Sequence, residues 1–185
     1  MAFKDTILTF EDDKIITDDG YHNMEVMMSW EDPIMKKSAE FICQSKGDIL
    51  EIGFGMGICS DYIQAQGVNS HAIVEMHPQI IEKLKVWAED KDNVTIVEGD
   101  WSNVELGTYD GIFLDTFGDE NLSRFKDFVI SKAKSGAKVT YWNNYEREDN
   151  QHDFSSIDYE VVNITPESNL YTDISNKYYM PKVVI

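Results

Sequence analysis

A short apolar segment that runs into three alternating glycines constrains the fold of this chain more than any other feature. The segment Asp48–Gly57 reads DILEIGFGMG, and a helix-compatible stretch follows from Ile58 to Gln66. A buried strand that ends in a glycine turn and enters a helix is a geometry that holds nucleotides. Glycine permits close approach of the backbone to a ligand, and the first turn of a helix offers unpaired N–H groups. The sequence therefore predicts an α/β fold with a ligand at this turn.

The spacing of the glycines distinguishes between two classes of nucleotide cofactor. It reads G-x-G-x-G, whereas the dinucleotide fingerprint G-x-G-x-x-G would need glycine where Ile58 stands. Glu51 lies two residues before the first glycine, and a carboxylate there suits an ammonium better than a pyrophosphate. We therefore expect S-adenosylmethionine (SAM), which carries an ammonium and no phosphate. The alternative is a strand-to-helix turn that binds no ligand.

Composition excludes several classes of function. A net charge of −18 over 185 residues argues against binding to nucleic-acid phosphates, which requires Lys and Arg on one face. The two cysteines, Cys43 and Cys59, form no C-x-x-C pair, so we expect neither a disulfide framework nor a metal site. We also find no signal peptide and no stretch near 18 apolar residues, and we therefore expect a cytoplasmic protein without a membrane span.

The order of predicted elements indicates one doubly wound domain over residues 1–185. Within the first 23 residues, β-prone runs at 6–10 and 14–17 predict a hairpin that could act as a lid. A long helix is expected from Met24 to Ser45, kinked or restarted at Pro33. Strands are then expected at 49–52, 71–75, 94–98, 111–114 and 137–141, helices at 58–66, 78–89 and 121–134, and a C-terminal antiparallel strand pair at 159–164 and 178–184.

Acidic residues follow several of the predicted strands, at the edge where ligands bind in such sheets. Glu75 lies 18 residues after Gly57, close to the distance at which an acid meets ribose hydroxyls. Asp100 and Trp101 suit an adenine, as an acceptor for its amine and a ring to pack on it. The alternatives are a solvated acid for Glu75 and a core residue for Trp101.

If the two preceding strand ends bind the ribose and the adenine, the end of the predicted strand 111–114 faces the reactive methyl group of SAM. Asp115 could hold a nitrogen nucleophile there and take its proton. Glu31 lies in a polar interruption, Trp30–Pro33, of an otherwise apolar segment. Taken alone, Glu31 is more simply a surface residue.

The chain resembles guanidinoacetate N-methyltransferase and the related arginine methyltransferases, which have a Rossmann-like class I methyltransferase fold. The similarity covers about residues 24–185. It is carried by VMMSWEDPIM at 26–35, ILEIGFGM at 49–56, GDW at 99–101, YDGIFLDT at 109–116, VTYWN at 139–143 and KYYMP at 177–181.

The resemblance implies roles for individual residues. It implies that Glu31 and Asp115 hold the guanidino group as catalytic residues. The cofactor contacts would be Met27, Met35, Glu51, Gly53, Phe54, Gly55, Met56, Gly57, Ile58, Cys59, Glu75, Met76, His77, Asp100, Trp101 and Asp115. The acceptor would contact Met27, Glu31, Asp115, Asn144 and Tyr145, the last two through backbone amides near the acceptor's own carboxylate.

The chain also departs from the family's pattern. Met28-Ser29 replaces a charged pair, and the residues at 117–120 and at 144–145 differ. An aromatic residue near the N-terminus helps to close the family's site, and here Phe10 or Tyr21 could take its place. These differences bear on the identity of the methyl acceptor more than on the methyl-transfer reaction.

The resulting expectation is a SAM-dependent N-methyltransferase that acts on a small guanidino acid such as guanidinoacetate. One alternative is methylation of arginine, free or in a peptide. Protein-directed relatives carry a long additional N-terminal region, so its absence here favours the small molecule. The other alternative is a SAM-binding protein without transfer activity. The sequence also leaves room for a homodimer.

Overall fold

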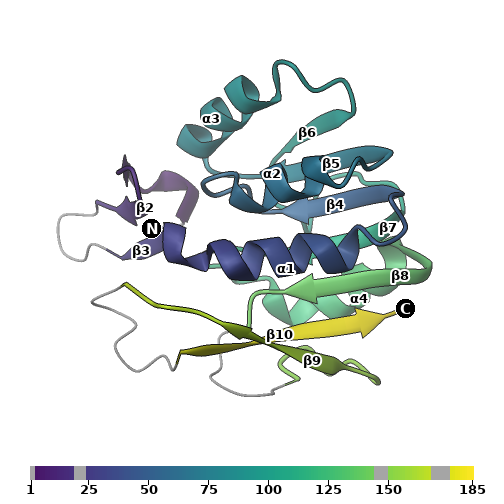
Figure 1. Cartoon of the computed structure of the whole chain (residues 1–185). Coiled ribbons are helices and arrows are strands. Elements are labelled where there is room, and N and C mark those ends of the chain that lie inside the picture. Colours follow the sequence, from purple (N-terminus) through teal and green to yellow (C-terminus); the bar gives the residue numbers. More distant parts are fainter. Residues whose placement is uncertain (1–2, 19–23, 144–149, 168–175) are drawn as a thin grey trace.

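The computed structural model describes residues 3–18, 24–143, 150–167 and 176–185, and the expected substrate residues Asn144 and Tyr145 lie outside these ranges. The strands and helices form a layered α/β arrangement with a smaller sheet at one side (Figure 1). None of the helices in the described ranges is long and apolar enough to cross a membrane.

Seven strands form the main sheet, in the order β6-β5-β4-β7-β8-β10-β9. Their bounds are β4 Asp48–Ile52, β5 Ser70–Glu75, β6 Val94–Glu98, β7 Tyr109–Leu114, β8 Ala133–Tyr141, β9 Asp158–Asn163 and β10 Lys177–Val184. Strands β4 to β8 are parallel, whereas β10 runs antiparallel to both of its neighbours, β8 and β9. The predicted mostly parallel sheet with a C-terminal antiparallel pair is therefore confirmed.

Helices cover both faces of this sheet, as expected for a doubly wound fold. Their bounds are α1 Asp32–Ile42, α2 Ile58–Ala65, α3 Pro78–Ala88 and α4 Phe125–Lys132. Side chains alternate between the two faces along each strand, so Ile49 packs with α1 and α2 whereas Leu50 packs with α4. Ile73 of β5 lies in a third cluster with α3. Helices α1, α2 and α3 thus share one face, and α4 covers the other.

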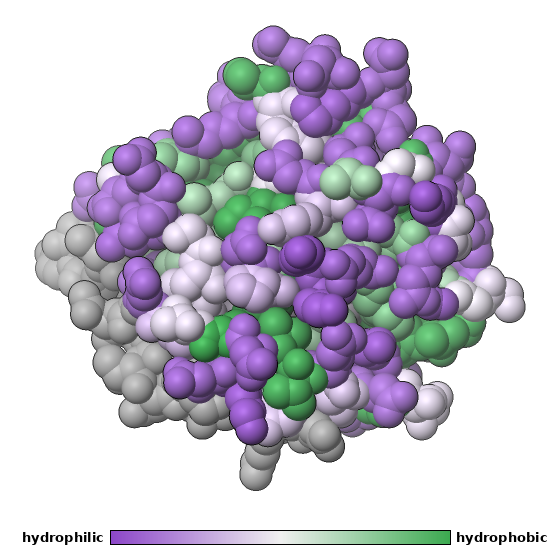
Figure 2. Space-filling view, viewed as in Figure 1, coloured by the Kyte–Doolittle hydropathy of each residue, from purple (hydrophilic) through white to green (hydrophobic). Residues whose placement is uncertain are grey.

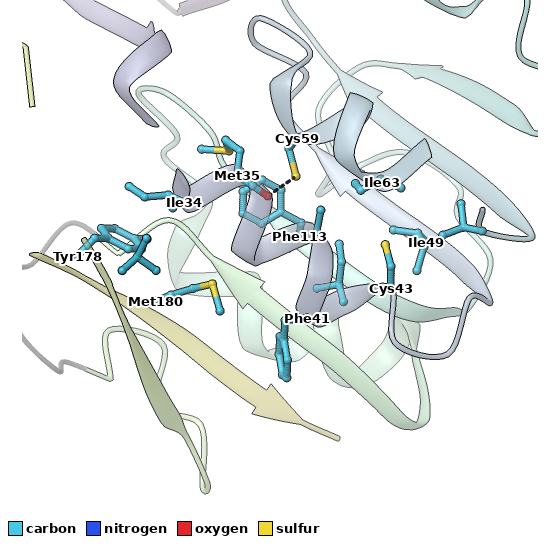
Figure 3. Packing of buried hydrophobic residues seen from close by; sticks show 14 of the residues in the cluster. Ile34, Met35, Phe41, Cys43, Ile49, Cys59, Ile63, Phe113, Tyr178 and Met180 are labelled. Atoms are coloured by element: carbon cyan, nitrogen blue, oxygen red, sulfur yellow. Dashed lines mark hydrogen bonds between the residues drawn. The ribbon is translucent and has the colours of Figure 1, made fainter. Parts of the chain in front are cut away.

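The core beneath α1 joins the central strands to the C-terminal pair (Figure 3). Met35 is fully buried, and its backbone carbonyl lies 3.8 Å from the Cys59 sulfur of α2. Phe113 of β7 and Met180 of β10 belong to the same cluster. A Cβ on Gly111 would collide with the Ile42 carbonyl, so this glycine allows α1 to lie close against β7. The surface of the molecule, seen from the same side as in Figure 1, is mostly hydrophilic with scattered apolar residues (Figure 2).

The N-terminal region is more extensive than the predicted hairpin. Strands β1 Leu8–Phe10 and β2 Lys14–Thr17 pair as expected, and β3 Glu25–Met28 adds a third antiparallel strand to them. The prediction of one helix from Met24 to Ser45 was therefore wrong in its first part. A 3-10 turn, Ser29–Glu31, follows β3, and α1 begins at Asp32 with Pro33 in its first turn, where a missing N–H costs nothing.

The predicted helix at 121–134 was also too long. A 3-10 turn at Leu122–Arg124 precedes the short helix α4, and the chain then enters β8 at Ala133. Ser135 and Gly136 lie inside β8 rather than between a helix and a strand. Ser135 and Gly136 fall in an irregularity of the β7–β8 register, and Gly136 and Ala137 hydrogen-bond to Ile185 there, so tertiary pairing overrides the local stop signal.

Candidate active site

A cavity of about 500 Å³ lies at the carboxyl ends of the parallel strands. Most of the residues predicted to hold the cofactor line it. These are Met27, Met35, Glu51, Gly53, Phe54, Gly55, Cys59, Glu75, Met76, Asp100, Trp101 and Asp115. The predicted residues Met56, Gly57, Ile58 and His77 lie beside the cavity in the glycine loop and at the helix starts rather than in its wall.

The three glycines are required by the shape of the loop that they form. Gly53, Gly55 and Gly57 all have positive φ angles, of 91°, 55° and 80°. A Cβ on Gly53 would collide with the backbone oxygen of Asp115, and a Cβ on Gly55 would collide with the Met27 sulfur. The loop is thus packed between β7 and β3, and it presents its backbone to the cavity.

Glu51 is a fully buried carboxylate on the cavity wall. Its Oε2 accepts a hydrogen bond of 2.5 Å from the Ser60 hydroxyl of α2. Its Oε1 has no hydrogen-bond partner among the described residues. A buried acceptor without a donor is costly, and an ammonium group in the cavity would supply one. The site therefore fits the ammonium of SAM.

Glu75 ends β5 and is held by the backbone. Its Oε1 accepts from the N–H groups of Met76 (2.7 Å) and His77 (2.8 Å), and its Oε2 accepts from the N–H of Phe54 (3.0 Å). An ionised carboxylate has about four acceptor positions, so Oε2 can accept a further hydrogen bond from a ligand hydroxyl. The His77 ring caps α3 and contacts the Thr6 carbonyl (3.1 Å).

Asp100 and Trp101 form the wall beyond β6. The Asp100 carboxylate accepts from the Ser102 backbone N–H (2.9 Å) and from the side-chain amide of Asn121 (3.0 Å). Trp101 is buried, and its indole N–H donates to Asp119 (2.6 Å). Asp119 also accepts from the Thr116 hydroxyl (3.0 Å) and thereby links this wall to the end of β7.

Asp115 and Glu31 are two carboxylates whose charges act on each other. Glu31 is 4% exposed and its Oε1 accepts from the Met28 N–H (3.2 Å). Burial first, and then the nearby Asp115, raises the pKa of Glu31 well above its usual range. Burial and the charge of Glu51 raise the pKa of Asp115 to about 7. Within the described part of the chain, neither acid forms an ion pair with a lysine or an arginine.

Tyr178 of β10 stands close to the same two acids. It is buried, and burial together with the charges of Asp115 and Glu31 raises its pKa well above the usual value. Its hydroxyl accepts a hydrogen bond of 2.7 Å from the Asn143 N–H, at the end of β8. The Asn143 side chain donates to the Tyr179 carbonyl (2.9 Å). This contact fixes the chain where it leaves β8 towards residues 144–149.

Several residues in the cavity wall were missed by the sequence analysis. They include Phe3, Lys4, Val26, and the segment from Thr116 to Asn121. Phe3 packs against Phe117 and His77, with ring centroids 5.1 Å and 5.0 Å apart. An N-terminal aromatic does reach the cavity, but it is Phe3 rather than Phe10, which packs under the Lys83 ammonium, and Tyr21 lies outside the described residues. No sequence pattern marks Phe3.

Comparison with solved structures shows the fold. A spermidine synthase from Thermotoga maritima aligns with a TM-score of 0.65 at 14% identity, covering 96% of this chain and 72% of that one. A protein described as a SAM-dependent methyltransferase from Streptococcus mutans aligns with a TM-score of 0.61 at 13% identity, covering 96% and 55%. The chain therefore has the Rossmann-like fold of class I methyltransferases, as predicted.

Comparison of sequences shows the family. Protein arginine N-methyltransferase 2 of Saccharomyces cerevisiae is 35% identical over 154 residues, which cover 75% of this chain and 37% of that protein. The protein of the same name from Aspergillus fumigatus is 32% identical over 182 residues, covering 91% and 40%. The chain thus spans about two fifths of the length of these relatives. The sequence model of the guanidinoacetate N-methyltransferase family matches residues 17–146, and the chain belongs to that family.

Proposed function

We propose that this chain is a SAM-dependent N-methyltransferase that acts on a guanidino nitrogen. The observation that carries the proposal is the pair of acids Glu31, which is buried, and Asp115, which lines a cavity that fits SAM. Both pKa values are raised, and neither acid pairs with a lysine or an arginine among the described residues. A planar guanidinium is the cation whose geometry suits two carboxylates, because it offers paired N–H donors.

The two acids would do three things for this acceptor. They would orient the guanidinium through N–H···O bonds, concentrate electron density on the nitrogen that reacts, and receive the proton which that nitrogen releases as it gains a methyl group. A free guanidinium is a poor nucleophile because its pKa is above 12. Asp115, with a pKa of about 7, suits the role of proton acceptor near neutral pH.

The cofactor would be held by residues that already face the cavity. Glu51 Oε1 would accept from the ammonium, Glu75 Oε2 from a ribose hydroxyl, and Trp101 would pack on the adenine. The backbone of the loop Gly53–Gly57 would follow the amino-acid part of the ligand. When bound, SAM supplies an electrophilic methyl group. Asp115 lies at the end of β7, directly against this loop, as its contact with Gly53 requires.

The acceptor that the relatives favour is the side chain of arginine, since the curated relatives are named protein arginine N-methyltransferase 2. This is the alternative rather than the first interpretation of the sequence. The second candidate is guanidinoacetate, which the matching family's description names. Both candidates present the same guanidinium to Glu31 and Asp115, and they differ in what surrounds it.

Isotope-labelled SAM tests the proposal. The protein would be incubated with arginine, an arginine-containing peptide and guanidinoacetate in separate reactions, and the products analysed by mass spectrometry. We expect a mass gain of one methyl group on a guanidino nitrogen, with arginine or the peptide as the preferred acceptor. Transfer to guanidinoacetate alone would favour the second candidate. Binding of SAM without transfer to any guanidine, or transfer only to oxygen or carbon acceptors, would refute the function.

A further inference from the structure

A buried polar chain runs behind the cavity wall at Glu51. His71, at the start of β5, is fully buried, and its Nε2 lies 2.9 Å from Glu51 Oε2. The Ser60 hydroxyl donates to the same oxygen at 2.5 Å. Glu51 Oε1, by contrast, has no hydrogen-bond partner among the described residues. The two oxygens of the Glu51 carboxylate thus have different surroundings, because both neighbours contact Oε2.

The other side of the His71 ring is also held. The side-chain nitrogen of Gln64 lies 3.2 Å from His71 Nδ1, and an amide N–H can only donate. Nδ1 is then the acceptor, which places the proton of a neutral imidazole on Nε2, facing Glu51. The Trp87 ring meets His71 edge-on at 6.3 Å and limits its rotation. The ring is therefore fixed from both sides.

We propose that His71 and Ser60 are positioning residues that hold Glu51 by Oε2 and so keep Oε1 turned to the cavity for a ligand ammonium. If either contact were lost, the carboxylate could rotate and place Oε1 against α2 or β5 instead. Neither residue lines the cavity, so neither touches the ligand directly. The inference rests on the proposed use of SAM, and it adds that the ammonium is recognised through a second layer of residues.

A pair of ligands that differ in the amino-acid part tests this role. S-adenosylhomocysteine carries the amino-acid part, whereas 5′-methylthioadenosine has the same adenosine and thioether without it. Calorimetry would measure the affinity of both ligands for the wild type and for His71→Ala and Ser60→Ala. We expect each variant to bind S-adenosylhomocysteine about tenfold more weakly, as the loss of a polar contact that orients a charged group implies. The affinity for 5′-methylthioadenosine should stay within about twofold.

Two variants serve as controls. His71→Gln keeps a side-chain N–H near Glu51 and should recover most of the affinity for S-adenosylhomocysteine, and Glu51→Gln should narrow the difference in affinity between the two ligands. An equal loss of affinity for both ligands, or no loss for either, would overturn the inference. Should His71→Ala fail to fold, the comparison of Ser60→Ala with wild type decides the same question. A wild-type protein that binds neither ligand would refute the proposed cofactor instead, so the two failures are distinguishable.

Discussion

Strands β4 and β7 each carry acids near both ends, and a lysine pairs with the acids at one end only. At the start of the strands, Lys134 bridges Asp48 (2.6 Å) and Asp110 (2.7 Å). At the other end, Glu51 of β4 and Asp115 after β7 face the cavity, and no lysine or arginine of the described residues pairs with them. The same two strands therefore offer an internal comparison between a neutralised and an uncompensated pair of acids.

The difference is visible in the pKa values. Hydrogen bonds from Lys134, Asn69 and Ser70 lower the pKa of Asp48 to about 2. Burial and the charge of Glu51 raise the pKa of Asp115 to about 7. Carboxylates that pair with a lysine of the protein stabilise the folded state. Carboxylates without a cation destabilise it until a ligand supplies the positive charge. This contrast is the physical basis for assigning the second end to ligand binding.

The largest expected effect separates the two ends of β7. Asp115→Asn should lower turnover about a thousandfold, as the loss of a proton acceptor typically does. S-adenosylhomocysteine affinity should stay within several-fold. Asp110→Asn, at the other end of the strand, should keep turnover within a few-fold and lower the melting temperature. Steady-state kinetics measures the turnover of both variants, and calorimetry measures the ligand affinity and the melting temperature. A large loss of cofactor affinity in Asp115→Asn would instead make Asp115 a cofactor residue.

The next effect concerns the second acid of the proposed acceptor site. Glu31→Gln keeps an oxygen for the Met28 N–H but removes a charge, so kcat/KM for the guanidino acceptor should fall about a hundredfold. Asp32→Asn is the matched control, because its carboxylate accepts a hydrogen bond from the Tyr62 hydroxyl of α2 (2.9 Å) and does not line the cavity. Equal kinetics for Glu31→Gln and Asp32→Asn would remove Glu31 from the site.

The two ends should also give opposite slopes of stability against pH. Asp115 has a raised pKa, so the folded protein keeps a proton that the unfolded chain releases, and stability falls as pH rises from about 4 to 7. For one group the slope is at most about 1.4 kcal/mol per pH unit. Asp48 has a lowered pKa, so its contribution is lost as pH falls from about 4 to 2. Urea unfolding at several pH values should show the first slope reduced in Asp115→Asn and the second reduced in Asp48→Asn. Unchanged slopes would contradict the comparison.

The smallest effect is expected at the lysine itself. Lys134→Met should lower the melting temperature by a few degrees and leave methyl transfer unchanged, because a partly exposed ion pair is screened by water and salt. The difference from wild type should shrink at about 1 M salt. Thermal unfolding followed by circular dichroism measures it. A loss of activity without a loss of stability would mean that the two ends of the strands are coupled.

The parts of the fold that sequence could predict are those set by local patterns. The turn from Gly53 to Gly57 and the acids after β5 and β7 were found because glycine spacing and strand ends lie in short windows. The strand Glu25–Met28 was mistaken for helix because its apolar run fits both periods, and its pairing with β2 is not apparent from the sequence of the strand itself. Pro33 was the available signal, since proline favours the first turn of a helix.

The candidate site shows the same limit. Glu31 and Asp115 come from a 3-10 turn and a strand end more than 80 residues apart, and only the resemblance to a family brought them together beforehand. Phe3, Asp119 and His71 were not predicted, because each acts through a contact across the fold rather than through a motif. The burial that raises the pKa of Asp115 is likewise a tertiary property.

The most direct test of the central claim compares a cation with a neutral group of the same shape. Citrulline replaces the guanidinium of arginine by a urea, so it keeps the planar form and loses the charge. Calorimetry on the protein loaded with S-adenosylhomocysteine would measure both ligands, free and in the same peptide. We predict that arginine binds at least about tenfold more tightly and releases protons on binding, because Glu31 and Asp115 ionise to meet it. Equal affinity for citrulline, with no proton release, would contradict the claim that these two acids bind a cationic acceptor.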